Sequence, residues 1–113
     1  MTKKVFIITE QGCRNLGQII RQFRESPKPN SPLGWSLDEF VAEIQRETGF
    51  LLSKSTLSKL ERGHSEPKWD TLAILAATGF ILNSRTQQPF TTAELFAIAC
   101  EQLDPIKGEY SVS

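Results

Sequence analysis

The residues whose chemistry is most evident lie in the stretch Ser53–Gly63, which reads Ser-Lys-Ser-Thr-Leu-Ser-Lys-Leu-Glu-Arg-Gly. Leu57 and Leu60 lie three positions apart, so they share one face of a helix and predict that this face is buried. The other face combines small hydroxyls with two cations and has no carboxylate: Lys54, Ser55, Ser58 and Lys59. A solvated helix face usually mixes both signs of charge, whereas hydroxyls and cations suit base edges and phosphate oxygens. The stretch therefore predicts a short helix with a nucleic-acid-binding face, although the two lysines could also be ordinary solvated side chains.

Apolar periodicity, capping residues and helix breakers predict the helices that must position this face. An amphipathic stripe indicates a first helix that begins near Thr9 or at Asn15. A capping box of Ser36 with Glu39 starts the second helix, and Gly49 ends it. The later helices are expected at about residues 37–48, 53–63, 67–79 and 92–104. The last of these begins at a second capping box, formed by Thr91 with Glu94, and ends before Pro105.

The segments between these helices have weaker signals. Val5–Ile8 is a short β-prone run, which predicts either an edge strand or an arm packed on the core. Three prolines make residues 26–34 a loop, residues 80–91 permit a small hairpin before the last helix, and residues 107–113 are expected to be a tail. Together the elements predict one all-α domain that covers residues 1–113, with a short extended arm at its start.

Composition excludes several classes of function. The formal net charge is zero, but six Lys or Arg oppose two Asp or Glu in residues 1–30, and four oppose two in residues 53–68. Positive charge is thus concentrated near the proposed binding face. Cys13 and Cys100 are too far apart in the sequence for a metal-ligand motif and are expected to be free thiols. We find no signal peptide, membrane span, catalytic constellation or metal motif, so we expect a cytoplasmic protein that is not an enzyme and binds no cofactor.

Four blocks of sequence resemble the XRE (lambda-repressor-like) helix-turn-helix family. They are Leu16-Gly17-x-x-Ile20-Arg21-x-x-Arg24, Ser36-Leu37-x-Glu39-Phe40-Val41-Ala42, the stretch Ser53–Gly63 without its second residue, and Pro67-x-x-Asp70-Thr71-Leu72. The resemblance covers about residues 16–79. It implies a five-helix lambda-repressor-like domain that binds duplex DNA, in which the helix from Ser53 is the recognition helix. Two departures are a proline-rich insert after the first helix and about five extra residues between Ala42 and Ser53, which require a longer second helix or a looser turn.

The resemblance and the residue types together assign roles to individual positions. Base contacts are expected from Lys54, Ser55, Ser58 and Lys59, and phosphate contacts from Ser36, Leu37, Ser53, Thr56, Arg62 and Lys68. Arg24 and Glu61 look like the structural ion pair that joins the first helix to the recognition helix in this family. The expected function is sequence-specific binding of double-stranded DNA by a transcriptional regulator. The alternative is a protein-interaction module on the same fold, an antitoxin-like subunit or adaptor that reads no bases.

The sequence also predicts assembly. Proteins with one helix-turn-helix commonly dimerise so that two recognition helices meet the major groove one turn apart, so a homodimer is expected. The favoured surface is the last helix, whose apolar residues Leu95, Phe96, Ala99 and Leu103 exceed what a small core needs. The run Val5–Ile8 is the second candidate surface. The alternative is that the last helix only covers the core of its own chain, and no small-molecule effector is identifiable.

Overall fold

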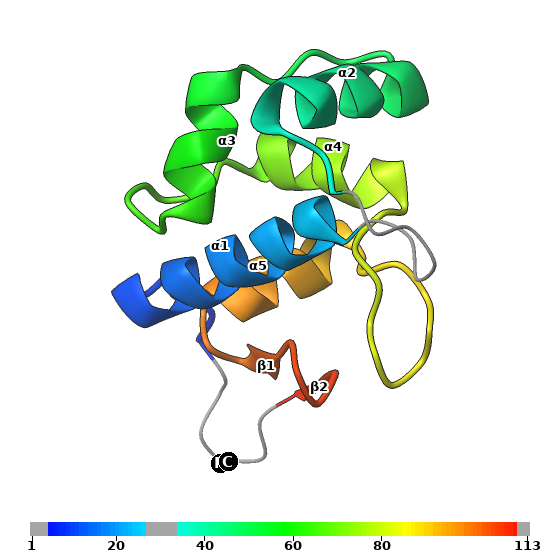
Figure 1. Ribbon diagram of the computed structural model, residues 1–113. Helices are drawn as coiled ribbons and strands as arrows, with labels where there is room; N and C mark the ends of the chain where they lie inside the picture. The colour runs from blue at the N-terminus through cyan, green and yellow to red at the C-terminus, as the bar shows by residue number, and fades with distance from the viewer. Residues whose placement is uncertain (1–4, 27–33, 111–113) are drawn as a thin grey trace.

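The computed structural model describes residues 5–26 and 34–110, and it is mainly helical, as predicted (Figure 1). The elements in chain order are α1 (Glu10–Glu25), α2 (Leu37–Thr48), α3 (Lys54–Glu61), α4 (Trp69–Thr78), α5 (Thr92–Ala99), β1 (Leu103–Asp104) and β2 (Glu109–Tyr110). The two short strands pair antiparallel, with Leu103 opposite Tyr110. Most of the expected loop at residues 26–34 and the last residues of the expected tail lie outside the described ranges.

The predicted capping residues begin the helices. The Thr9 hydroxyl accepts a hydrogen bond from the Gly12 amide, so α1 starts at the earlier of the two expected positions. Both capping boxes form: Ser36 with Glu39 at the start of α2, and Thr91 with Glu94 at the start of α5. Each box satisfies backbone amides that have no partner inside the helix. These local interactions fix where α2 and α5 begin.

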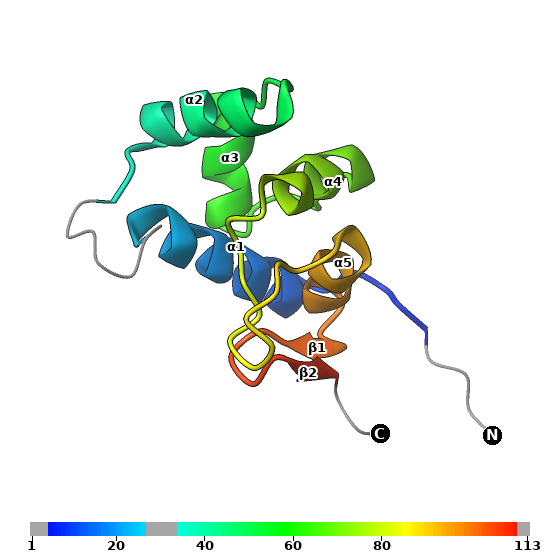
Figure 2. The same ribbon diagram turned by 90° about the vertical axis from the view of Figure 1, so that its right-hand side faces the viewer.

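One apolar core joins all five helices. α1 packs against α3 and α5, and α4 packs against α2 and α5. Figures 1 and 2 show α2 at one end of the molecule and the β1–β2 pair at the other, with α1 and α5 between them. The largest fully buried side chains are Phe40, Phe90, Leu16, Ile20, Ile44, Leu57, Leu72, Leu75, Leu95 and Ile98. The core therefore takes residues from every helix, which fixes the orientation of α3 relative to the rest.

The expected start of the last helix is confirmed, but its expected end was wrong. α5 ends at Ala99 because the chain closes it with backbone bonds from the Gln102 amide to the Ala97 carbonyl and from the Glu101 amide to the Ile98 carbonyl. Glu101 has a φ of 59°, the left-handed conformation that this type of helix end requires. The apolar residue Leu103 is buried in β1 and not on the helix, and Glu109–Tyr110 forms β2 where a tail was expected.

The last helix covers the core of its own chain. Leu95, Ala99 and Leu103 are buried in the single chain, and the half-buried Phe96 packs edge to face on Trp69 with ring centroids 5.8 Å apart. The apolar width that favoured α5 as a dimer surface is therefore used within the chain. These residues therefore leave less apolar surface on α5 for a partner, and the homodimer itself stays a prediction.

The two expected extended pieces are both present in reduced form. Val5–Ile8 is not in a strand: Ile8 packs against the core, and the Thr9 amide donates to the Ala99 carbonyl, but Val5 and Ile7 are exposed. A small hairpin precedes α5, as expected: Leu82 bridges Pro89, the Asn83 amide donates to the Gln88 carbonyl, and the Phe90 amide donates to the Ile81 carbonyl. No helix in residues 5–26 and 34–110 has the length and apolar character to cross a membrane.

The two cysteines lie near the contact between α1 and the end of α5. Cys13 and Cys100 are both buried and both free thiols. Burial raises the pKa of each thiol above its ordinary value, because an apolar environment disfavours the thiolate. Both side chains therefore act as small apolar core residues.

α1 approaches α3 closely at Gly17, and this contact generates a prediction. A Cβ atom at this position would lie 2.4 Å from the Leu60 carbonyl oxygen and 2.5 Å from that of Glu61, both backbone atoms that cannot move aside. Gly17→Ala is expected to lower the free energy of unfolding by about 1–3 kcal/mol, as overpacking does, although alanine favours helices. Urea unfolding measures this loss. The control is Gln18→Ala at the exposed neighbouring position, and equal stability of the two variants would contradict the close approach.

Candidate nucleic-acid interface

The burial of two leucines orients α3. Leu57 and Leu60 are buried in the core beside Phe40, Ile44 and Leu72. The opposite side of the helix therefore faces solvent. Exposed there are Lys54, Ser55, Thr56 and Lys59, and Ser58 is half-buried. α3 thus presents the four residues expected to read bases on one side of a helix whose other side is fixed by packing.

Arg24 holds the C-terminal end of α3. Its Nε donates to Glu61 Oε2 at 2.7 Å and its Nη2 to Glu61 Oε1 at 3.0 Å, so the expected ion pair is present and bidentate. The Nη1 group donates to the Trp35 carbonyl oxygen at 2.7 Å, just before α2. The hydrogen bonds to Glu61 raise the pKa of Arg24 above its ordinary value. One guanidinium thus joins α1, the start of α2 and the end of α3.

The N-terminal end of α3 lies beside the first turn of α2. Ser53 caps α3, because its Oγ accepts from the Thr56 amide at 3.0 Å and donates to Thr56 Oγ1 at 2.8 Å. Lys54 Nζ lies 3.3 Å from Asp38 Oδ2 in an exposed ion pair. Such a pair has little effect on stability, because both side chains stay in water. It does place a carboxylate next to one of the expected base-reading cations.

A groove between α3 and the start of α4 collects hydroxyl and cationic side chains. It has a volume of about 440 Å³, and Ser53, Thr56, Lys59 and Lys68 all contribute to its lining. These groups are donors suited to phosphate oxygens, and Lys68 precedes the first turn of α4. Glu66 also lines the groove and reduces its positive charge. The groove brings together three of the six residues expected to contact phosphate.

The other three expected phosphate contacts are placed less favourably. Ser36 uses its hydroxyl and amide in the capping box, and Leu37 is followed directly by the exposed carboxylates of Asp38 and Glu39. These negative charges oppose a phosphate at the start of α2. Arg62 is exposed, but its Nε donates to the Ser58 carbonyl at 3.3 Å, so the guanidinium lies back over the last turn of α3.

The connection between α2 and α3 is longer than a usual helix-turn-helix turn. α2 ends at Thr48 and α3 begins at Lys54, so Gly49–Ser53 separates them, compared with the about 3–4 residues of a typical turn. A longer second helix and a looser turn were expected as alternatives. Both are present, since α2 continues to Thr48 and the connection to α3 is long. Phe50 and Leu51 are 62% and 66% exposed in this connection. The surface beside α3 is consequently apolar on one side.

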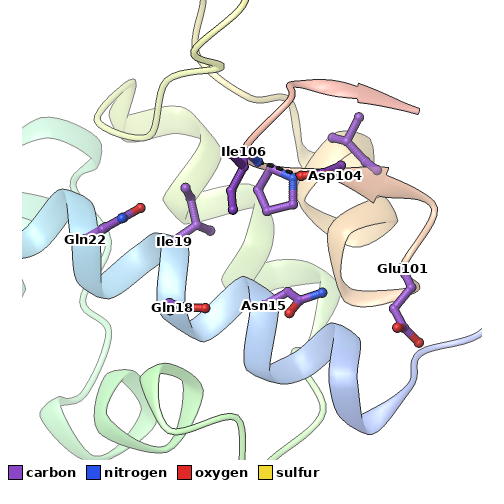
Figure 3. Close-up of a pocket in the computed structure, with 9 residues that line it drawn as sticks. Asn15, Gln18, Ile19, Gln22, Glu101, Asp104 and Ile106 are labelled. Carbon is purple, nitrogen blue, oxygen red and sulfur yellow. Dashed lines mark hydrogen bonds between the residues drawn. The ribbon is translucent and has the colours of Figure 1, made fainter. Parts of the chain in front are cut away.

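A second hollow lies on the side of α1 that faces away from α3 (Figure 3). It has a volume of about 360 Å³ and lies between α1 and the chain after α5. Its polar groups include three α1 amides, Asn15, Gln18 and Gln22, together with the carboxylates of Glu101 and Asp104. The Thr9 hydroxyl donates to Glu101, and the Ile106 and Lys107 amides donate to Asp104, so both carboxylates already have partners. At 100° per residue, this side of α1 faces away from α3, and the hollow is separate from the candidate interface.

Comparisons with protein-family models, with curated proteins and with solved structures found no match to this chain. Within the described ranges, no group of three His, Cys, Asp or Glu side chains is arranged to hold a metal ion.

The sequence interpretation missed two features of the site. It gave Gly17 no role, although a glycine inside an amphipathic stripe often marks a close backbone approach. The second feature is the Lys54–Asp38 ion pair, because no signal in the sequence pairs these two residues.

The Arg24–Glu61 ion pair generates a prediction about stability. Only 14% of the Arg24 side chain and 6% of the Glu61 side chain are exposed. Glu61→Ala is expected to lower the free energy of unfolding by about 3 kcal/mol, because it leaves a largely buried cation without its partner. Thermal and urea unfolding measure this effect. The control is Glu25→Ala, which removes an exposed carboxylate 3.9 Å from Arg24 and should leave the unfolding midpoint nearly unchanged.

Proposed function

We propose that this chain binds double-stranded DNA sequence-specifically through α3, as a helix-turn-helix transcriptional regulator of the XRE (lambda-repressor-like) type. In this proposal α3 enters the major groove, and Lys54, Ser55, Ser58 and Lys59 read base edges. Lysine most often selects the O6 and N7 acceptors of guanine. The five-helix arrangement and the capping at Ser36 and Ser53 support the proposal because they agree with the resemblance of the sequence.

The observation that carries this proposal is the solvent-facing side of α3. It holds two lysines and three hydroxyl residues without a carboxylate of its own, on a helix whose other side is buried. Glu61, the only acidic residue of α3, is turned inward and neutralised by Arg24. A helix that removes its one carboxylate from the exposed face and leaves its cations in solvent suits a polyanionic partner.

The groove between α3 and α4 supports a phosphate contact next to the base-reading residues. Ser53 and Thr56 at its edge offer hydroxyl groups, and Lys59 and Lys68 offer charge. Contacts of this kind fix the register of a protein on the duplex but do not read its sequence. We therefore assign positioning to Ser53, Thr56 and Lys68, and specificity to the residues that project from α3.

A second candidate function is a protein-interaction module without base readout. The observation that favours it is the exposed apolar pair Phe50 and Leu51, which adjoins the start of α3. Apolar side chains at this position would contact another protein better than a phosphate backbone. The Lys54–Asp38 pair also lowers the positive potential of the surface. Salt-dependent binding to duplex DNA separates this function from the proposed one.

Removal of either lysine tests the base-reading face. Lys54→Ala or Lys59→Ala is expected to weaken binding to a duplex selected from a random pool by about 1–3 kcal/mol, because a bidentate base contact is lost. Alanine favours helices, so α3 should remain folded. Fluorescence anisotropy measures affinity, and circular dichroism checks the fold. Lys107→Ala, an exposed lysine in the β1–β2 turn, is the control and should bind like the parent. Parent-like affinity of both α3 variants would exclude this face.

Asp38 gives a test in the opposite direction. Asp38→Asn removes the carboxylate that pairs with Lys54 and that opposes phosphate at the start of α2, so binding to duplex DNA of any sequence should become several-fold tighter. The gain should shrink as salt concentration rises, because it is electrostatic. Glu109→Gln, an exposed acid in β2, changes net charge equally and is the matched control. An identical gain in both variants would show a general charge effect and not a local one.

A further inference from the structure

A pocket with an apolar lining lies between the C-terminal end of α2 and the solvent-facing side of α4. It has a volume of about 520 Å³, within the about 300–1,000 Å³ typical of binding pockets. Phe50 from the α2–α3 connection and Ala73, Ile74 and Ala77 from α4 supply apolar surface. Two carboxylate residues, Glu47 and Asp70, also line it. The pocket therefore suits an apolar segment that carries positive charge beside it.

The N-terminal arm of the chain is a segment of this chemistry. Val5 and Ile7 are 63% and 65% exposed, and no residue of Val5–Ile8 belongs to a strand. In an extended chain, residues two apart point to the same side, so Val5 and Ile7 would enter a pocket together. Lys3 and Lys4 directly precede them in the sequence. The arm thus offers an apolar pair next to two cations.

The arm and the pocket are complementary within one sequence, but the arm leads away from the pocket of its own chain. Figures 1 and 2 show the described start of the arm leaving the molecule beside α5, on the side away from α2. The pocket lies at the α2 end, between α2 and α4. The arm of a second copy of the chain is therefore a better candidate for this pocket than the arm of the same chain.

Charge favours this occupant over a direct pairing of two pockets. If the pockets of two copies packed against each other, Glu47 and Asp70 of one copy would lie close to Glu47 and Asp70 of the other. Like charges brought together at a contact disfavour it. The lysines of the arm would instead lie near these carboxylates, while Val5 and Ile7 cover the apolar lining.

We propose that the pocket between α2 and α4 receives the N-terminal arm of a second copy of this chain. Two copies that exchange arms form two equivalent contacts and close a two-fold dimer. The contact lies away from α5, which covers its own core, and it does not depend on DNA binding. The dimer therefore forms in the absence of DNA.

The experiment is a complementation test on full-length protein without DNA. Val5→Glu/Ile7→Glu removes the apolar pair of the arm, and Ala77→Lys places a bulky cation in the pocket, at an exposed position of α4, where it opposes the lysines of the arm. Light scattering at tens of micromolar should give the mass of two chains for the parent and of one chain for each variant. An equimolar mixture of the two variants should recover two-chain particles, because one intact arm then meets one intact pocket. Ile106→Glu, at a residue that is 82% exposed in the β1–β2 turn, is the control and should stay dimeric.

A charge exchange gives a second test that needs no bulky change. Glu47→Lys alone and Lys3→Glu/Lys4→Glu alone should each weaken the dimer in sedimentation equilibrium, and the combined variant should recover it. Circular dichroism checks that each variant is folded. A monomeric parent, a parent-like mass for the arm or pocket variant, or a monomeric mixture of the two would overturn the exchange. The exchange would also be overturned if the combined charge variant dimerised no better than the Glu47→Lys variant or the Lys3→Glu/Lys4→Glu variant. These results test the dimer alone, and the proposed DNA contacts of α3 are tested separately by the lysine variants.

Discussion

Three contacts of one guanidinium join the end of α3 to α1 and to the residues before α2. Arg24, near the end of α1, binds both carboxylate oxygens of Glu61 and the carbonyl of Trp35. The Trp35 amide in turn donates to the Arg24 carbonyl at 2.8 Å, so the residues before α2 are tied to α1 from both sides. Arginine suits this place because its planar group donates in several fixed directions at once, whereas a lysine would contact Glu61 through a single nitrogen.

This ion pair also determines which charges α3 shows to solvent. Glu61 is the only acid in α3, and its burial against Arg24 leaves the exposed side with lysines and hydroxyls. The close approach of α1 at Gly17 permits the pair, because any side chain there would push Leu60 and Glu61 outward. The leucines alone would orient the helix, but without the pair an uncompensated carboxylate would lie near the proposed DNA surface. Fold and surface charge are thus fixed by the same contact.

The sequence predicted best what local chemistry decides. Capping boxes at Ser36 and Thr91 and the apolar period of each helix gave the starts of α2 and α5 and the number of helices. The end of α5 was missed because Glu101 takes a left-handed conformation that glycine usually signals, and because Leu103 satisfies the apolar pattern equally well from a strand. The Lys54–Asp38 pair was missed because it depends on the relative placement of two helices, which periodicity does not give.

The lengthened connection between α2 and α3 links the two proposals. Between Ala42 and Ser53 the chain has more residues than the family that its sequence resembles. They extend α2 through Glu47 and Thr48, and these two residues and Phe50 line one side of the pocket. The same connection sets the angle at which α3 leaves α2, because Ser53 must cap α3 from its end. An arm that binds beside Phe50 would also restrain the segment that precedes α3. Assembly of two chains and the orientation of the helix proposed to bind DNA are therefore expected to be coupled through this one connection.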